Sequence, residues 1–186
     1  MSFDLAVLEA IERHRTGWAD AATRGLMDAG QPAATYVLAG LAALVFAWAC
    51  RAWWAVAAAM VSSFVATGLA EWLKEVIGRP RPPADLALVP TDGAAFPSSI
   101  AALTAGAAVP LVLWGLRRAD RVGRLVAGVL TIGTLAVGVS MTYLGAHWVT
   151  DVLAGWALGA GVGGAASWSS ERLANRRTVI AGEPVA

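Results

Sequence analysis

Five long apolar stretches constrain what this chain can fold into more than any other feature. A bilayer-spanning helix needs roughly 20 mainly apolar residues, and segments of about that length lie at residues 32–50, 53–77, 98–116, 125–146 and 149–170. Hydrophobic residues make up 58% of the chain and charged residues only 15%, whereas a soluble domain usually carries about 25% charged residues. We therefore predict an all-α, polytopic membrane bundle of about five transmembrane helices.

Residues 1–31 show a different pattern. Leu5, Leu8 and Ile11 alternate with charged residues at helical spacing, which favours one or two amphipathic helices at the membrane interface. A soluble cap packed on the bundle would give the same pattern. The predicted organisation is an interfacial helical segment at 1–31, a transmembrane domain at 32–170 and a cytoplasmic tail at 171–186.

Five spans place the two ends of the chain on opposite sides of the membrane. Cytoplasmic loops usually carry an excess of Lys and Arg. One predicted face has six basic residues and the other has eight, namely Arg51, Arg117, Arg118, Arg121, Arg124, Arg172, Arg176 and Arg177. We therefore predict a multi-pass protein of the cell membrane, with its C-terminus in the cytoplasm and its N-terminus outside.

Three polar segments fall on the predicted outer face. They are KEVIGRPRP at 74–82, PSS at 97–99 and SMTYLGAHWVTD at 140–151. Each lies at an end of a predicted span, so all three share one membrane level although they are far apart in sequence. A carboxylate inside a span costs about 2.5–3.5 kcal/mol on insertion scales, which argues that Asp151 is kept for a function. We expect the three segments to form one extracytoplasmic site.

The residue types in these segments suit a phosphate group. Arg81 offers a planar fork that matches phosphate oxygens, and Lys74 adds a second cation. Ser98 lies where a helix begins, so free backbone N–H groups and the helix dipole favour an anion there. His147 and Asp151 are four residues apart, so the carboxylate can fix the imidazole tautomer and favour its cationic form. Membrane anchoring and helix capping would explain the cations and the serine singly, but not the whole set.

The three segments resemble the signature of the type 2 phosphatidic acid phosphatase (PAP2) superfamily, which is related to vanadium haloperoxidases. The family pattern is Lys, six residues, Arg-Pro; then Pro-Ser-Gly-His; then Ser-Arg, five residues, His, three residues, Asp. The matching residues here are Lys74, Arg81, Pro82, Pro97, Ser98, Ser140, His147 and Asp151. The resemblance covers residues 74–151 with the helices around them and implies a PAP2-like core.

The resemblance also implies a role for each matching residue. In such enzymes the last histidine attacks phosphorus and forms a phosphohistidine, and the aspartate orients it. Carried over, His147 is the nucleophile and Asp151 its orienting partner. The phosphate-binding residues would be Lys74, Arg81, Ser98, Ser99 and Ser140.

Three positions depart from the family pattern. Ile100 stands where the family has its acid histidine, Met141 where it has a second arginine, and Ser99 where it has a glycine. Isoleucine cannot carry a proton, and losing a general acid typically costs about 10²- to 10⁴-fold in rate. With methionine at position 141, the bidentate phosphate contact of the family's arginine is absent. That contact would stabilise the transition state most.

These departures bear on the substrate. A monoester such as phosphatidic acid expels an alkoxide that needs a proton, whereas a pyrophosphate expels a phosphate whose second pKa is about 6. We therefore expect a lipid phosphatase that hydrolyses a lipid phosphate or, better, a polyprenyl pyrophosphate. The alternative is a catalytically impaired PAP2-like protein that binds or transports a phospholipid or polyprenyl phosphate. The retained pair of His147 and Asp151 favours the enzyme, because binding alone does not need a nucleophile.

The remaining expectations concern cofactors and partners. We expect no metal or other cofactor, because one histidine with scattered carboxylates does not give metal-ligand spacing. The nine tryptophans fit an interfacial belt at the span ends, so the expected partner is the lipid bilayer and not nucleic acid. Gly155, Gly159 and Gly163 form a small-residue stripe that suits either a homodimer or packing inside the bundle.

Overall fold

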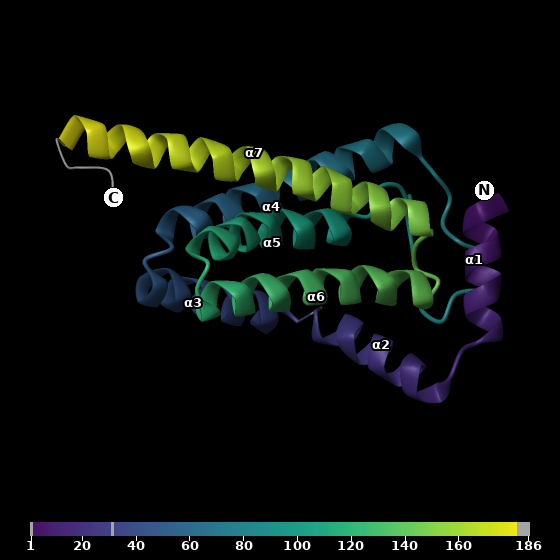
Figure 1. Ribbon diagram of the computed structural model, residues 1–186. Coiled ribbons are helices and arrows are strands. Elements are labelled where there is room, and N and C mark those ends of the chain that lie inside the picture. Colours follow the sequence, from purple (N-terminus) through teal and green to yellow (C-terminus); the bar gives the residue numbers. More distant parts are fainter. Residues whose placement is uncertain (1, 31, 182–186) are drawn as a thin grey trace.

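The computed structural model describes residues 2–30 and 32–181, which form seven α-helices and no strand (Figure 1). The helices are α1 (Ser2–Arg13), α2 (Gly17–Ala29), α3 (Ala33–Cys50), α4 (Trp53–Ile77), α5 (Ser99–Arg118), α6 (Arg121–Tyr143) and α7 (Val149–Ala181). Five of them, α3 to α7, contain a segment long and apolar enough to cross a membrane. The predicted all-α bundle with five transmembrane helices is thereby confirmed.

The fourth span lies a few residues earlier than the sequence predicted. The prediction was 125–146, but α6 begins at Arg121 because the Asp120 side chain accepts a hydrogen bond from the Gly123 backbone N–H at 2.7 Å and caps the helix. The helix ends before Gly145, whose φ of +70° lies in the left-handed region that favours glycine. This turn leaves His147 outside both flanking helices.

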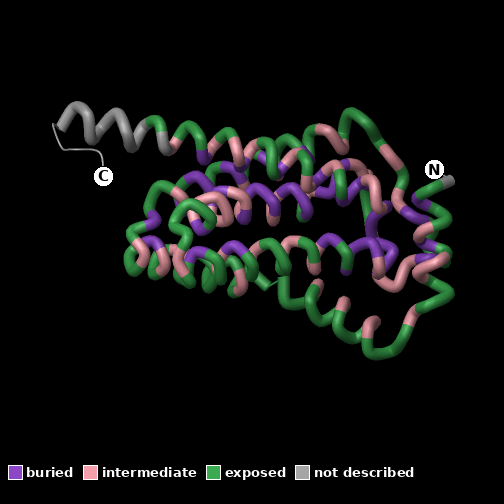
Figure 2. The backbone as a smooth tube through the Cα atoms, viewed as in Figure 1, coloured by how far each residue is buried: buried purple, intermediate pink, exposed green. Residues whose placement is uncertain are grey.

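α5 is the central helix of the bundle and contacts α4, α6 and α7. Figure 2 shows that buried positions gather on the inner helices and at the end of the bundle next to α1. On α7, a Cβ at Gly155 or Gly159 would collide with a backbone carbonyl oxygen of α5. The small-residue stripe therefore serves close packing inside the bundle, and the homodimer that it also suited stays a prediction.

α1 lies across one end of the bundle, and α2 leads from it along α6 towards α3 (Figure 1). Leu8 of α1 is 1% exposed and packs with Leu86, Ala95 and Trp148. α2 has no buried residue, but Tyr143 of α6 donates a hydrogen bond to its Asp20 at 2.7 Å. The packing of α1 agrees with a cap on the bundle, and the position of both helices in the membrane interface stays a prediction.

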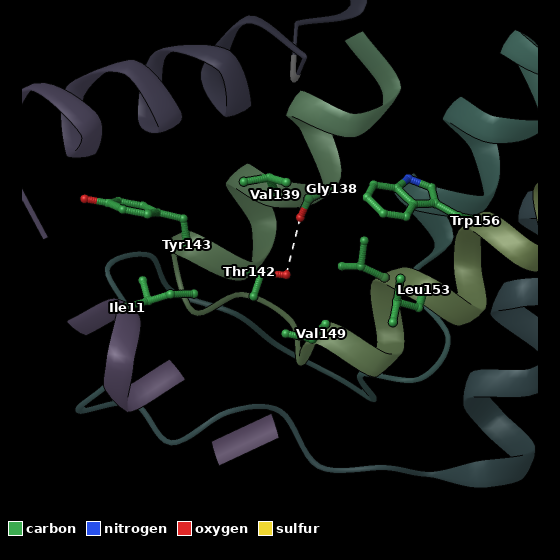
Figure 3. A pocket seen from close by; sticks show the side chains of 9 residues that line it. Ile11, Gly138, Val139, Thr142, Tyr143, Val149, Leu153 and Trp156 are labelled. Atoms are coloured by element: carbon green, nitrogen blue, oxygen red, sulfur yellow. Dashed lines mark hydrogen bonds between the residues drawn. The ribbon is translucent and has the colours of Figure 1, made fainter. Parts of the chain in front are cut away.

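An apolar cavity of about 300 Å³ lies between α1, α6 and α7 (Figure 3). Ile11 of α1 lies on one side of it, and Val149, Leu153 and Trp156 of α7 line it together with residues of α6.

The predicted tail at 171–186 is divided by the structure. Residues 171–181 continue α7, and residues 182–186 lie outside the described residues. The basic loop between α5 and α6 lies at the end of the bundle opposite α1 (Figure 1). This separation is the arrangement on which the predicted orientation rests.

Candidate active site

The three polar segments meet at the end of the bundle that α1 covers (Figure 1). α4 is capped at its C-terminus by Gly78, whose φ is +61°, and five prolines within residues 79–98 keep the following loop from forming another helix. The loop is fastened to the turn before α7, where the Leu88 N–H donates to the Leu144 carbonyl oxygen at 2.8 Å. The chain thereby places the first and third segments side by side.

His147 and Asp151 form a buried pair at the start of α7. Their side chains are 3% and 0% exposed, and Nδ1 of His147 lies 3.4 Å from Oδ2 of Asp151. The same carboxylate oxygen accepts a hydrogen bond from the Trp148 backbone N–H at 3.0 Å. The four-residue spacing thus brings the two side chains together, with the histidine in the turn and the aspartate on the helix.

Arg81 determines the tautomer of His147. Its Nη1 lies 3.0 Å from Nε2 of His147 and also donates to the Ala146 carbonyl oxygen at 2.7 Å. A guanidinium has donors and no acceptor, so Nε2 accepts from it and the ring proton is on Nδ1, towards Asp151. The neutral ring therefore directs its lone pair towards Arg81, the cation that sequence analysis assigned to phosphate.

The surroundings of His147 also set its charge. Burial lowers the pKa of His147 because the charged ring would lose its hydration, and the positive charges of Arg81 and Lys74 act in the same direction. The hydrogen bond and charge of Asp151 raise this pKa but do not outweigh them. The sequence led us to expect that Asp151 favours the cationic ring, whereas the buried position beside two cations favours the neutral ring.

Lys74 and Ser99 face each other between α4 and α5. Nζ of Lys74 donates to Oγ of Ser99 at 2.8 Å and forms an ion pair with Glu71 at 3.0 Å. Two of the three cations of the first segment, Lys74 and Arg81, line an open hollow of about 430 Å³, to which Glu71, Glu75 and Asp92 add negative charge. We refer to it as the basic hollow after Lys74 and Arg81, the two cations among its five charged lining residues.

Ser98 is placed differently from its neighbour. It is fully buried, caps α5 by accepting from the Ala101 N–H at 3.4 Å, and donates its backbone N–H to the Asp151 carbonyl oxygen at 3.0 Å. Its hydroxyl lies 3.7 Å from Sδ of Met141. Of these two adjacent serines, both predicted to bind phosphate, the structure brings only Ser99 into contact with Lys74, while Ser98 joins α5 to α6 and α7.

Ile100 and Met141, two of the three departures from the family pattern, line one cavity. It has a volume of about 440 Å³, lies between α2, α3, α5 and α6, and is also lined by Ser140 and Leu144. Its remaining lining residues are largely apolar, so we call it the apolar pocket. Ser140, predicted to bind phosphate, thus lies on this side of α5 and not with the residues of the basic hollow.

Arg79 and Asp4 were missed by the sequence analysis. Nη1 of Arg79 donates to Oδ1 of Asp151 at 2.6 Å, and Nη2 donates to Oδ2 of Asp4 at 2.8 Å. A second arginine two residues before Arg81 was the only signal for Arg79. Nothing in the sequence relates Asp4 to Thr150, 146 positions later, because that contact exists only when α1 crosses the end of the bundle.

Comparison with known proteins places this chain in a family. The model of the PAP2 superfamily matches residues 51–174, which include the three segments and four of the five spans. The chain belongs to the PAP2 superfamily, and it is a multi-pass membrane protein of the PAP2-type lipid phosphatase family. No curated protein matches it.

Two solved structures have the same fold. A crystal structure of a transmembrane PAP2 type phosphatidylglycerolphosphate phosphatase from Bacillus subtilis is 26% identical with a TM-score of 0.77, over 92% of this chain and 86% of that one. The crystal structure of LpxE from Aquifex aeolicus is 23% identical with a TM-score of 0.69, over 87% of this chain and 93% of that one. At the lower identity the similarity establishes the fold alone.

Proposed function

We propose that this protein is a PAP2-type phosphatase that hydrolyses a lipid pyrophosphate by way of a phosphohistidine at His147. The observation that carries the proposal is the 3.0 Å contact between Nε2 of His147 and Nη1 of Arg81. It combines a nitrogen lone pair with a cation suited to phosphate at the edge of the basic hollow. A nucleophile backed by a carboxylate is the arrangement that covalent catalysis needs.

The chemistry proceeds in two steps. Nε2 of His147 attacks the terminal phosphorus, so that a P–N bond forms while the P–O bond to the lipid phosphate breaks and its electron pair leaves with the bridging oxygen. Asp151 accepts the Nδ1 proton's hydrogen bond throughout and stabilises the charge that develops on the ring. Water then attacks the phosphohistidine, the P–N bond breaks, and inorganic phosphate and neutral His147 result.

The apolar pocket supports a pyrophosphate over a monoester. The family places its acid histidine where this chain has Ile100, and here that position borders a pocket lined by no histidine, lysine or carboxylate. An alkoxide leaving group would find no histidine or carboxylic acid there to protonate it, whereas a departing lipid phosphate with a second pKa near 6 needs little help. The pocket also offers the lipid chain an apolar surface next to the start of α5.

The test is phosphate release by the purified protein in detergent. Phosphatidic acid and a polyprenyl pyrophosphate are supplied side by side, with His147→Ala as the inactive control and His14→Gln as the control for loss of a histidine elsewhere. We expect release from the pyrophosphate that the first variant abolishes and the second retains. Equal release by His147→Ala would show that His147 is not the nucleophile.

A second candidate function is binding of a lipid phosphate without turnover. Ile100 and Met141 favour this candidate, because they are apolar where the family has a histidine and an arginine. The cations Lys74 and Arg81 remain. In that case neither substrate releases phosphate, yet the double variant Ile100→His with Met141→Arg does. That outcome would replace the phosphatase proposal with the binder.

A further inference from the structure

Arg79 connects α1 to the His147–Asp151 pair. Its Nη1 donates to Asp151 at 2.6 Å and to the Thr150 hydroxyl at 2.6 Å, while its Nη2 donates to Asp4 at 2.8 Å. The guanidinium also lies over the rings of Phe96 and Trp148, at 5.9 and 5.5 Å from their centroids. Arg79 is therefore held on several sides at once, and its fork is divided between two carboxylates.

Asp4 is built into the same junction. It is 3% exposed, and its two oxygens accept hydrogen bonds from the Thr150 backbone N–H at 3.0 Å and the Thr150 hydroxyl at 2.7 Å. Burial acts to raise the pKa of Asp4, but the hydrogen bonds from Thr150 and Arg79 outweigh it and lower that pKa. A buried, ionised carboxylate on an end helix, bonded beside the reactive pair, is more than a helix needs for packing.

The charge of Asp151 is shared between two partners. Its Oδ2 faces Nδ1 of His147, and its Oδ1 faces Arg79. An isolated buried carboxylate beside an imidazole would favour the protonated ring strongly, because each charge would be the other's main partner. A guanidinium on the second oxygen weakens that pull, since the carboxylate is already paired.

We propose that Arg79, fixed in place by Asp4, is a positioning residue that pairs with Asp151 and so keeps His147 unprotonated at Nε2, which makes α1 part of the active site. The inference rests on the proposed function, in which Nε2 of His147 must stay unprotonated so that its lone pair can attack phosphorus. Neither Arg79 nor Asp4 contacts the phosphate in this account, because both act through Asp151.

The other charged groups around His147 come from three elements. Asp151 faces it from α7, Arg81 from the loop of residues 79–98, and the charge of Lys74 acts from α4. None of these three residues is itself substituted in the Arg79 or Asp4 variants. A change in the protonation of His147 in those variants is therefore attributable to the junction at Arg79.

The experiment measures the ring of His147 directly. The chain has two histidines, so a His14→Gln background with ¹³C-labelled histidine leaves one ring signal to titrate by NMR in detergent micelles. We expect Arg79→Gln to raise the pKa of His147 by roughly one pH unit, and Arg79→Lys, which keeps the charge, to raise it less. An unchanged pKa in Arg79→Gln would overturn the proposal.

Asp4→Asn separates positioning from simple charge. Removing a carboxylate by itself lowers the pKa of a nearby histidine, whereas releasing Arg79 from Asp151 raises it. We expect a rise of about half a pH unit, with no change in Glu9→Gln, which removes an exposed carboxylate from the same helix. A fall, or the same result in both variants, would show that Asp4 does not hold Arg79. Should Arg79→Gln not fold, Arg79→Lys and Asp4→Asn still decide the question.

The activity measurement distinguishes this inference from the proposed function. In an active protein we expect Asp4→Asn to lower kcat by about tenfold with little change in KM, because substrate binding in the basic hollow is left intact. The acid limb of the pH profile should move to higher pH together with the NMR titration. An inactive natural protein with the expected NMR shifts would refute the phosphatase and leave the junction in place, whereas activity without the shifts would refute only the junction.

Discussion

The two sides of the start of α5 are chemically opposite. On the α4 side, Ser99 faces Lys74 in the basic hollow. On the α6 side, Ile100 and Met141 face the apolar pocket. Ser99 and Ile100 are consecutive residues, and they face different sides because successive residues of a helix point about 100° from each other.

The difference shows which half of the family's chemistry this chain retains. In the proposed function, Lys74 and Arg81 of the basic hollow and the adjoining His147 capture phosphorus, while the apolar pocket has Ile100 where the family has the acid that assists departure. A site divided in this way favours a leaving group that is stable without a proton. The two sides of α5 therefore bear on the choice of substrate, and substitutions in the basic hollow or in the apolar pocket can test this.

The largest effect is expected on the basic side. Arg81→Gln removes the fork that faces His147 and should lower kcat/KM for the pyrophosphate by roughly 10²- to 10³-fold, because a preorganised contact to the transition state is lost. Arg81→Lys should recover part of the loss, since it keeps the charge without the planar geometry. If Arg81→Gln releases phosphate at the natural rate, the basic hollow is not where phosphate binds.

A gain of activity is expected on the apolar side. Ile100→His returns a titratable group to the family's acid position and should raise phosphate release from phosphatidic acid by about 10²-fold, with a smaller gain for the pyrophosphate. Leu103→His is the matched control, because Leu103 lines the same pocket one turn farther along α5. Equal gains for both substrates, or the same gain from the control, would contradict the leaving-group argument.

The smallest effect is expected where the two sides are joined. Gly155→Ala places a Cβ against the Ser98 carbonyl oxygen and 2.8 Å from the Ala101 Cβ, which should destabilise the fold by about 1–3 kcal/mol through overpacking. Gly161→Ala on the same helix is the control, since a Cβ there meets nothing within 4 Å. Thermal unfolding in detergent measures the difference. Equal unfolding temperatures of the two variants would mean that α5 and α7 accommodate the Cβ at position 155 without a loss of stability.

The sequence predicted the site unevenly. Lys74, Arg81, His147 and Asp151 could be identified because fixed spacing and costly burial of charge mark them along the chain. The separate environments of Ser98, Ser99 and Ser140 could not, because neighbouring helical residues turn to different faces only once their partners are in place. The neutral state favoured for His147 depends in the same way on burial and on cations from other segments.

The sequence by itself determined the five spans, the all-α class and the composition of the three polar segments, since each follows from local hydrophobicity, helix length or motif spacing. Only the tertiary structure decided that Ile100 and Met141 share one pocket and that α1 brings Asp4 to Arg79 beside Asp151. The physical reason is that the hydrophobicity of a segment indicates by itself whether that segment lies in the membrane. A contact between distant segments depends on how the helices pack against each other. The protonation state of a buried histidine likewise depends on the groups that the packed helices place around it, and not on the residue alone.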